Sequence, residues 1–130
     1  MEGRRTWVIV ASRDHAMRGV DGGFVMANHG KRAPLARMSR GDRILIYSPK
    51  TSHPTGDPLK AITIVGEVTG EEPEPSTVIP DGFRRRAKLR EITPLPLASI
   101  RDHLPTSSLR FGFFELNADD AEAIWAMADA

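Results

Sequence analysis

The chain has 130 residues, 40% of them hydrophobic, with a formal net charge of +1 and no cysteine. These numbers predict one soluble domain with an ordinary core, and they exclude a disordered chain, a disulfide framework and thiolate metal sites. No apolar run reaches the roughly 18 residues of a membrane span, and no signal-peptide pattern opens the chain, so we expect a cytoplasmic protein.

The first half of the chain alternates apolar runs with segments rich in glycine and proline. Residues 6–12 (TWVIVAS) predict a strand, and the following RDHAMRGV predicts only a turn or a brief helix. The glycine-rich segment up to Lys31 predicts no regular structure. A short helix over 34–39, with Pro34 in its first turn, and a strand over 43–48 come next. Residues 49–58 contain three prolines and a glycine and predict a loop.

The second half predicts more strands and the best-defined helix. A strand over 59–72, with Gly66 at a bulge or a sheet corner, leads through a proline-rich loop to a strand over 83–94. A short helix over 96–104 and a strand over 111–116 follow. Residues 117–130 predict a helix that Asn117 caps and whose apolar stripe faces the core. The stripe consists of Ala121, Ile124, Trp125 and Ala128. We expect Trp7, in the first strand, to be a core residue too.

About five strands joined by short helices, with few hairpin turns, predict an α+β fold in one domain over residues 1–130. The expected architecture is a curved, mixed or mostly antiparallel sheet, nearly a barrel, with short flanking helices.

Charge is unevenly distributed along the chain. Residues 1–50 hold ten Lys or Arg against four Asp or Glu, and residues 51–130 hold eight against thirteen. The basic half suits an anionic partner such as nucleic acid, although the two halves could equally neutralise each other across the fold.

The strand FRRRAKLRE concentrates cations on one side. Strand alternation places Phe83, Arg85, Ala87 and Leu89 on one face and Arg84, Arg86, Lys88 and Arg90 on the other. Residues on one face lie about 6.6 Å apart, close to the phosphate spacing of an extended nucleic-acid strand. We expect these four cations to contact phosphates; the alternative is a solvated face neutralised by Glu71, Glu72 and Glu74.

No catalytic or metal-binding motif is apparent. The four histidines (His15, His29, His53 and His103) show no metal-ligand spacing, and Arg32 replaces the hydroxyl residue that a nucleotide-binding Gly-Lys-Ser/Thr loop needs after Gly30-Lys31. His15 and His53 are expected in solvent. Only His29, in GFVMANHGK, has neighbours that indicate a site; a buried His29 that merely ties the loop to the backbone is the alternative.

Four segments in this order, WVIVASRDH, GGFVMANHGK, PLARMSRGDRILIYSPK and LKAITIVGEV, resemble the EVE domain of the PUA-like superfamily, as does the C-terminal part. The resemblance implies a PUA-like fold and kinship with YTH domains, which read methylated adenine in RNA through an aromatic cage. It implies a non-catalytic reader of a modified base in DNA or RNA, with no cofactor and no metal. Trp7 and Trp125 are the only tryptophans, so we expect a Phe/Tyr-lined pocket instead of an indole cage.

In such a fold, the loop after the first strand and the His-Gly-Lys loop border a pocket for one flipped-out base. Asn28 and His29 would read the edge of the base, and glycines such as Gly23 and Gly30 would let the backbone approach it. Phe24 and Tyr47 would stack on it. The remaining candidates are Ser12, Arg13 and Ser48 at the pocket and Lys31 and Lys50 on flanking phosphates.

Two other functions remain open. Related ASCH domains include small amidohydrolases that act on modified nucleosides, and Lys31 and Glu67 could supply two of their catalytic groups. Pro34 stands where such an enzyme has a hydroxyl residue, which weakens that interpretation. A protein-interaction role through the basic strand is the third alternative.

Overall fold

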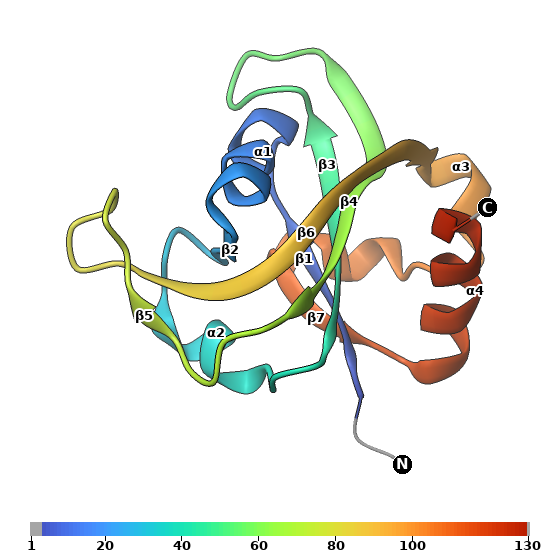
Figure 1. The fold of residues 1–130 in the computed structure, drawn as a ribbon. Coiled ribbons are helices and arrows are strands. Elements are labelled where there is room, and N and C mark those ends of the chain that lie inside the picture. Colours follow the sequence, from blue (N-terminus) through green and yellow to red (C-terminus); the bar gives the residue numbers. More distant parts are fainter. Residues whose placement is uncertain (1–3, 130) are drawn as a thin grey trace.

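A computed structural model describes residues 4–129, and a curled mixed sheet dominates it (Figure 1). The order of the sheet is β2-β6-β4-β3-β1-β7, with β5 paired to β6. The strands are β1 (Thr6–Val10), β2 (Phe24–Val25), β3 (Arg43–Lys50), β4 (Pro58–Val68), β5 (Glu74–Pro75), β6 (Phe83–Pro96) and β7 (Phe113–Leu116). The helices are α1 (Arg13–Gly22), α2 (Arg32–Arg37), α3 (Leu97–Ile100), the 3₁₀ helix η1 (Thr106–Phe111) and α4 (Ala118–Asp129). This half-barrel is the α+β, PUA-like architecture that the sequence predicts.

Strand β1 lies between β3 and the edge strand β7 and so brings the two ends of the described chain together. It pairs in parallel with β3, as Trp7 with Ile44, and antiparallel with β7, as Ile9 with Phe113. The rings of Trp7 and Phe113 stack with centroids 5.0 Å apart. Strand β1 therefore gains its second neighbouring strand only when residues more than a hundred positions later in the chain lie beside it.

Alternation along the strands divides the apolar residues into two cores, one on each face of the sheet. In β3, Ile44 and Ile46 join a cluster under α1 and α2, whereas Leu45 and Tyr47 join a cluster under α3 and α4. Trp7 is fully buried in the first cluster, as predicted. In α4, Asp120 donates its backbone N–H to Asn117 Oδ1 (2.9 Å), which confirms the predicted cap. Ile124 is buried in the second cluster and Trp125 packs half-buried beside it.

Several elements differ from the sequence prediction. RDHAMRGV is part of a ten-residue helix, α1, that ends at Gly23 in a left-handed conformation (φ 77°). Gly19 lies where α1 packs closely against the following strand. A Cβ there would lie 2.3 Å from Phe24 O, so this glycine serves close packing and not flexibility. The two short strands β2 and β5, each paired with β6, and the 3₁₀ helix η1 lie in segments that the sequence predicts as irregular. The predicted strand over 59–72 ends at Val68.

Gly66 is not a bulge. The register of β4 shifts between Ile62 and Ile64, whereas Gly66 pairs regularly with Ile44 and Leu89. A Cβ at Gly66 would lie 2.3 Å from Lys88 O, so its missing side chain lets β6 cross β4 closely. No helix within residues 4–129 has the length and apolar character needed to cross a membrane.

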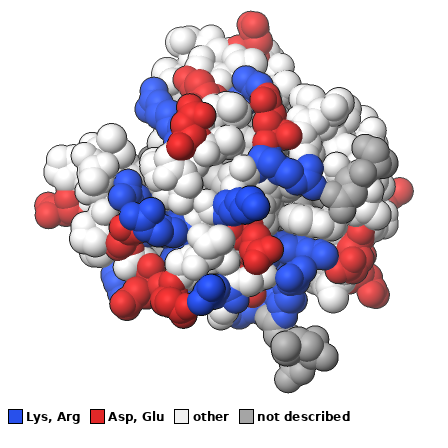
Figure 2. Space-filling model, in the orientation of Figure 1, with Lys and Arg blue, Asp and Glu red and all other residues white. Residues whose placement is uncertain are grey.

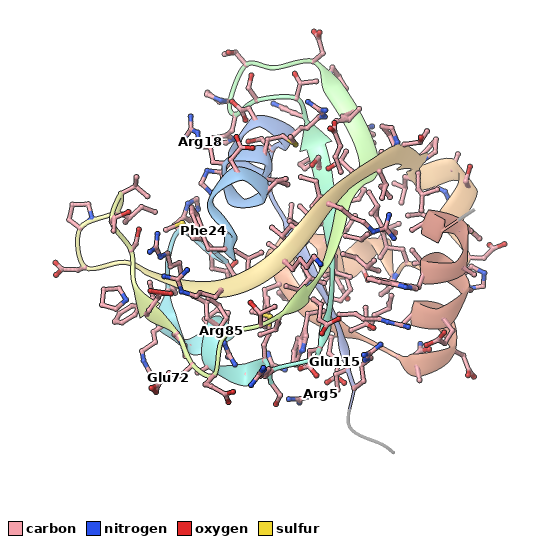
Figure 3. The ribbon with its side chains drawn as sticks, viewed as in Figure 1. Arg5, Arg18, Phe24, Glu72, Arg85 and Glu115 are labelled. Carbon is pink, nitrogen blue, oxygen red and sulfur yellow. The ribbon has the colours of Figure 1, made fainter. Side chains whose placement is uncertain are left out.

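Arg85, on the inward face of β6, joins three segments through one buried guanidinium (Figure 3). Its Nη1 donates to Leu35 O and Met38 O, both at 2.7 Å, at the end of α2. Its Nη2 donates to Gly70 O at 2.9 Å. Burial lowers the pKa of Arg85 from its usual value, although nearby Asp42 opposes this. The residue is 1% exposed, so its charge is stabilised by backbone carbonyls instead of water.

Replacing Arg85 with methionine should destabilise the fold strongly, because the carbonyls of Leu35, Met38 and Gly70 lose their donor while remaining buried. We expect the free energy of unfolding, measured by urea denaturation, to fall by roughly 3 kcal/mol. Arg86→Met is the matched control on the same strand: Arg86 is exposed and its ion pair with Glu74 is worth less than about 1 kcal/mol. Equal losses in the two variants would contradict the role given to Arg85.

Candidate functional site

A cavity of about 710 Å³ opens beside the carboxyl end of β1. We call it the histidine cavity, because His15 of α1, His29 of the turn after β2 and His53 of the loop after β3 all line it. Its wall comprises residues 10–12, 14, 15, 18, 26–30, 49, 50, 53, 79 and 109–112. The volume falls within the range of small-molecule sites, and the lining mixes apolar, imidazole and hydrogen-bonding side chains.

A tight turn over Ala27–Gly30 places Asn28 and His29 on the wall. Gly30 donates its backbone N–H to Ala27 O (3.1 Å), and the two central residues have positive φ angles of 49° and 64°. Positive φ at both central positions is the pattern of a type I′ turn, in which Asn is favoured and His is tolerated. Phe83 donates its backbone N–H to Gly30 O at 2.8 Å and so fixes the turn to β6.

The side chain of Asn28 lies against Gly112, which comes 84 residues later in the chain. A Cβ at Gly112 would lie 2.3 Å from Asn28 Oδ1, so only glycine fits there, and its φ of 75° also favours glycine. Val10 donates its backbone N–H to Gly112 O (3.0 Å), which ties this wall of the cavity to β1. The amide of Asn28 is thereby positioned from both sides.

At the start of α1, a hydrogen bond shifts the pKa of one side chain of the cavity, and burial and neighbouring charges shift the pKa of another. Ser12 Oγ donates to Asp14 Oδ1 (2.8 Å) and lowers the pKa of Asp14 below its usual value. Burial, followed by the charge of Arg18, lowers the pKa of His15, with His29 adding to the effect and Asp14 opposing it. At neutral pH the wall therefore presents a carboxylate acceptor and a neutral imidazole, which both donates and accepts.

Cations and one exposed aromatic ring complete the wall. Arg18 extends from α1 (Figure 3), Lys50 donates to Pro54 O (2.8 Å), and the guanidinium of Arg110 lies 4.9 Å from the centre of the Phe111 ring. Phe111 is 56% exposed although it is a large apolar residue. Asp14 is the only carboxylate among the described residues that line the cavity.

The structure brings five of the predicted site residues together: Ser12, Asn28, His29, Gly30 and Lys50 all line the histidine cavity. The two predicted borders, the loop after the first strand and the His-Gly-Lys segment, do face one hollow. Lys31 lies just outside it as the exposed N-cap residue of α2.

The two residues expected from β3 do not reach this cavity. Tyr47 is 4% exposed and packs into the core under α3 and α4, on the other face of the sheet. Ser48 is completely buried, and its hydroxyl shares a 2.8 Å hydrogen bond with Thr63 Oγ1. Both side chains are buried inside the protein, so neither is available to a ligand in the cavity.

Three further predicted residues are used by the protein itself. Arg13 forms an ion pair with Glu91, and Gly23 ends α1 by donating its N–H to Gly19 O (2.7 Å). The ring of Phe24 packs against Gly22, where a Cβ would lie 2.3 Å from it, and lies 5.0 Å from the guanidinium of Arg84. The flexibility expected of the glycines before Phe24 is thus replaced by close packing.

The cations of β6 share the outward face as predicted, but two of them are ion-paired. Glu74 Oε1 accepts from Arg86 Nε at 2.8 Å, and Glu74 Oε2 lies 3.7 Å from Arg84 Nη2. Figure 2 shows Lys and Arg interspersed with Asp and Glu on the viewed face instead of forming one basic stripe. Lys88 and Arg90 are exposed. A role of this strand in binding phosphates remains a prediction.

The wall residues that the sequence analysis missed include Asp14, His15, Arg18, His53, Arg110 and Phe111. His15 and Arg18 sit three residues apart in a segment predicted as only a turn or a brief helix, and this spacing places them on one face of α1. His53 and Arg110 lie in segments predicted as loops, and Phe111 was placed at the start of a predicted strand. In the part of the chain that the structure describes, no group of three or more His, Cys, Asp or Glu residues could hold a metal ion.

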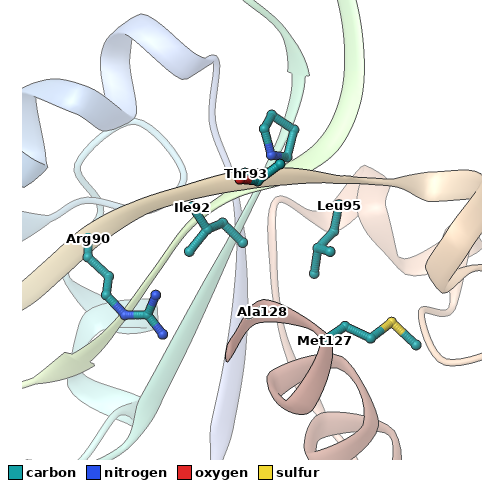
Figure 4. A pocket seen from close by; sticks show the side chains of 7 residues that line it. Arg90, Ile92, Thr93, Leu95, Met127 and Ala128 are labelled. Atoms are coloured by element: carbon teal, nitrogen blue, oxygen red, sulfur yellow. The ribbon is translucent and has the colours of Figure 1, made fainter. Parts of the chain in front are cut away.

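A second hollow of about 410 Å³ lies between β6 and the end of α4 (Figure 4). Ile92, Leu95 and Met127 lie on its wall together with Arg90 and Thr93. It shares no residue with the histidine cavity and lacks a set of converging polar groups. The histidine cavity is therefore the stronger candidate for a functional site.

Neither tryptophan lines the histidine cavity. Trp7 is buried, and Trp125 lies under the guanidinium of Arg43, 4.6 Å from the ring centre. Lys31 and Glu67, the residues considered for an amidohydrolase, do not line the cavity either.

Two solved structures share this fold at low sequence identity. The YTH domain of the MRB1 protein of Zygosaccharomyces rouxii, solved with N6-methyladenosine RNA, has a TM-score of 0.69 at 12% identity, covering 100% of this chain and 87% of that one. The human THYN1 protein, solved with DNA containing 5-methylcytosine, has a TM-score of 0.61 at 10% identity, covering 97% of this chain and 98% of that one.

Sequence comparison is more specific. A UPF0310 protein of Mycolicibacterium vanbaalenii is 41% identical over 128 residues, which cover 91% of this chain and 88% of the relative. The model of the EVE domain matches residues 5–127. This match spans nearly every described element, and we conclude that the chain belongs to the EVE domain family.

Proposed function

We propose that the histidine cavity binds a single modified nucleobase that has left the stack of a nucleic-acid strand, and that the protein reads this base without catalysis. The observation that carries the proposal is the cavity itself, which has the volume of a small-molecule site and converging donors and acceptors. The fold neighbours that hold N6-methyladenosine RNA and 5-methylcytosine DNA support it.

The chemistry of the wall suits the flat faces and polar edge of a base. Imidazole rings stack on bases, and His15, His29 and His53 supply three of them. Asn28 donates and accepts along one edge, and the Asp14 carboxylate accepts from an amino or imino group. Arg18, Lys50 and Arg110 then lie at the wall to contact phosphates on either side of the flipped nucleotide.

The amidohydrolase alternative has less support, since Lys31 and Glu67 lie outside the cavity. Incubation with modified nucleosides followed by mass spectrometry separates the two functions. A reader leaves every nucleoside unchanged, whereas an amidohydrolase changes the mass of its substrate.

Asn28→Gly should weaken binding of the modified base. Glycine adopts the positive φ at this position without strain, so the turn is kept while the reading amide is lost. In titrations of oligonucleotides that carry 5-methylcytosine or N6-methyladenine, at one stated salt concentration, we expect affinity to fall about tenfold. Thermal unfolding should remain near that of the wild type.

The control for this experiment is Asp81→Gly, which also replaces a residue of positive φ (60°) by glycine, outside the cavity wall. Its affinity should equal that of the wild type. If wild-type protein binds modified and unmodified oligonucleotides equally, the reader function is wrong.

The low pKa of His15 should make the fold less stable in mild acid. Because the unfolded chain binds a proton at its ordinary pKa near 6.5 while the folded chain binds it only at lower pH, stability is full above about pH 6.5 and falls as the pH drops through the window below it. Urea denaturation at about pH 7.5 and about pH 5.5 measures this loss. His15→Gln should show a smaller loss, and an unchanged pH dependence would contradict the assignment.

A further inference from the structure

We propose that Phe111 acts as a wedge in duplex DNA: its ring enters the base stack and fills the space that a modified base leaves when it turns into the histidine cavity. This inference rests on the proposed function and extends it to a specific substrate form, double-stranded DNA. It assigns a role to a side chain that base reading inside the cavity does not require.

The first argument is the exposure of Phe111. Among the described residues, Phe111 and Val78 are the large apolar side chains that are strongly exposed, at 56% and 71%. A large apolar side chain is stabilised when it is removed from water. Phe111 is at the same time part of the cavity wall, so it stands where a base must pass.

The second argument is that the backbone holds Phe111 outward. Phe111 ends the 3₁₀ helix η1, and Gly112 follows it in a left-handed conformation, donating its N–H to Leu109 O at 3.1 Å. Gly112 O accepts the backbone N–H of Val10, and its Cα abuts Asn28. The backbone next to the exposed ring is thus tied to β1 and lies beside the amide that would read the base.

The third argument is charge. The segment 105–112 (PTSSLRFG) contains no carboxylate, and its exposed side chains include Thr106, Ser107 and Arg110. The Arg110 guanidinium lies over the Phe111 ring and can extend the apolar surface while contacting a phosphate. The loop around Val78, in contrast, follows Glu71, Glu72 and Glu74 and precedes Asp81, so it suits a polyanion less well.

The geometry favours duplex DNA over the other nucleic acids. A wedge is useful only where the stack would otherwise close behind the departing base, which is the situation in a duplex. Apolar side chains inserted between base steps from the minor groove are a known means of unstacking duplex DNA, whereas sequence-specific recognition of RNA uses loops, bulges and ends whose bases are already unstacked and need no wedge.

The test compares duplex and single-stranded forms of the same oligonucleotide, one set with a 5-methylcytosine and one with an N6-methyladenine. We expect Phe111→Ala to lower affinity for the modified duplex at least tenfold, since unstacking costs a few kcal/mol per step. Its affinity for the modified single strand should stay within about twofold of wild type, a difference of less than 0.5 kcal/mol. The fluorescence of a 2-aminopurine placed next to the modified base should increase when wild-type protein binds, and should increase much less when the variant binds.

Val78→Ala is the matched control, because it removes the other exposed apolar side chain, and it should bind both forms as the wild type does. Phe111→Leu should keep part of the duplex affinity, since a wedge needs apolar volume.

Equal weakening of duplex and single-strand binding by Phe111→Ala would place the ring on the base inside the cavity and overturn the wedge. Wild-type binding to the single strand alone would also overturn it while leaving the reader function intact. Wild-type protein that binds neither modified form would overturn the reader function itself.

Discussion

The position of the candidate site depends on one buried guanidinium. Arg85 donates to the carbonyls of Leu35 and Met38 at the end of α2 and to that of Gly70 after β4. Helix α2 begins two residues after the turn that carries Asn28 and His29, and Phe83, two residues before Arg85, holds the same turn through Gly30 O. Strand β6 therefore holds the turn directly at Gly30 and, through Arg85, holds the helix that follows it.

Much of the fold was predictable from local patterns. Period-two alternation located the main strands and put Arg85 on the inward face of β6, and the cap at Asn117 located α4. Helix α1 was predicted as only a turn or a brief helix because RDHAMRGV is short and weakly patterned and glycines follow it. Gly19 and Gly22 both lie against Phe24, which comes later in the chain. Long-range packing of this kind leaves no signal in local propensity.

The site was predicted about as far as local sequence allows. The sequence analysis placed its two borders in the loop after the first strand and in the His-Gly-Lys loop. Ser12, Asn28, His29 and Gly30 from these segments do line one cavity. Tyr47 and Ser48 were misplaced because alternation along β3 puts Tyr47 in the core under α3 and α4, and Ser48 is buried against Thr63 of the neighbouring strand. The wall formed by Arg110, Phe111 and Gly112 could not be foreseen. Only the pairing of β7 with β1 brings this distant segment to the cavity.

The pairing of the last strand with the first has a consequence for biosynthesis. While the ribosome still holds residues 113–116, β1 lacks its β7 neighbour and Trp7 lacks the ring of Phe113. The nascent chain must then keep an apolar sheet edge exposed until residues 113–116 have left the ribosome, and chaperones engage such surfaces. The preceding segment supplies Phe111 and Gly112, so a product truncated before residue 111 would lack both the β7 neighbour of β1 and this wall of the histidine cavity.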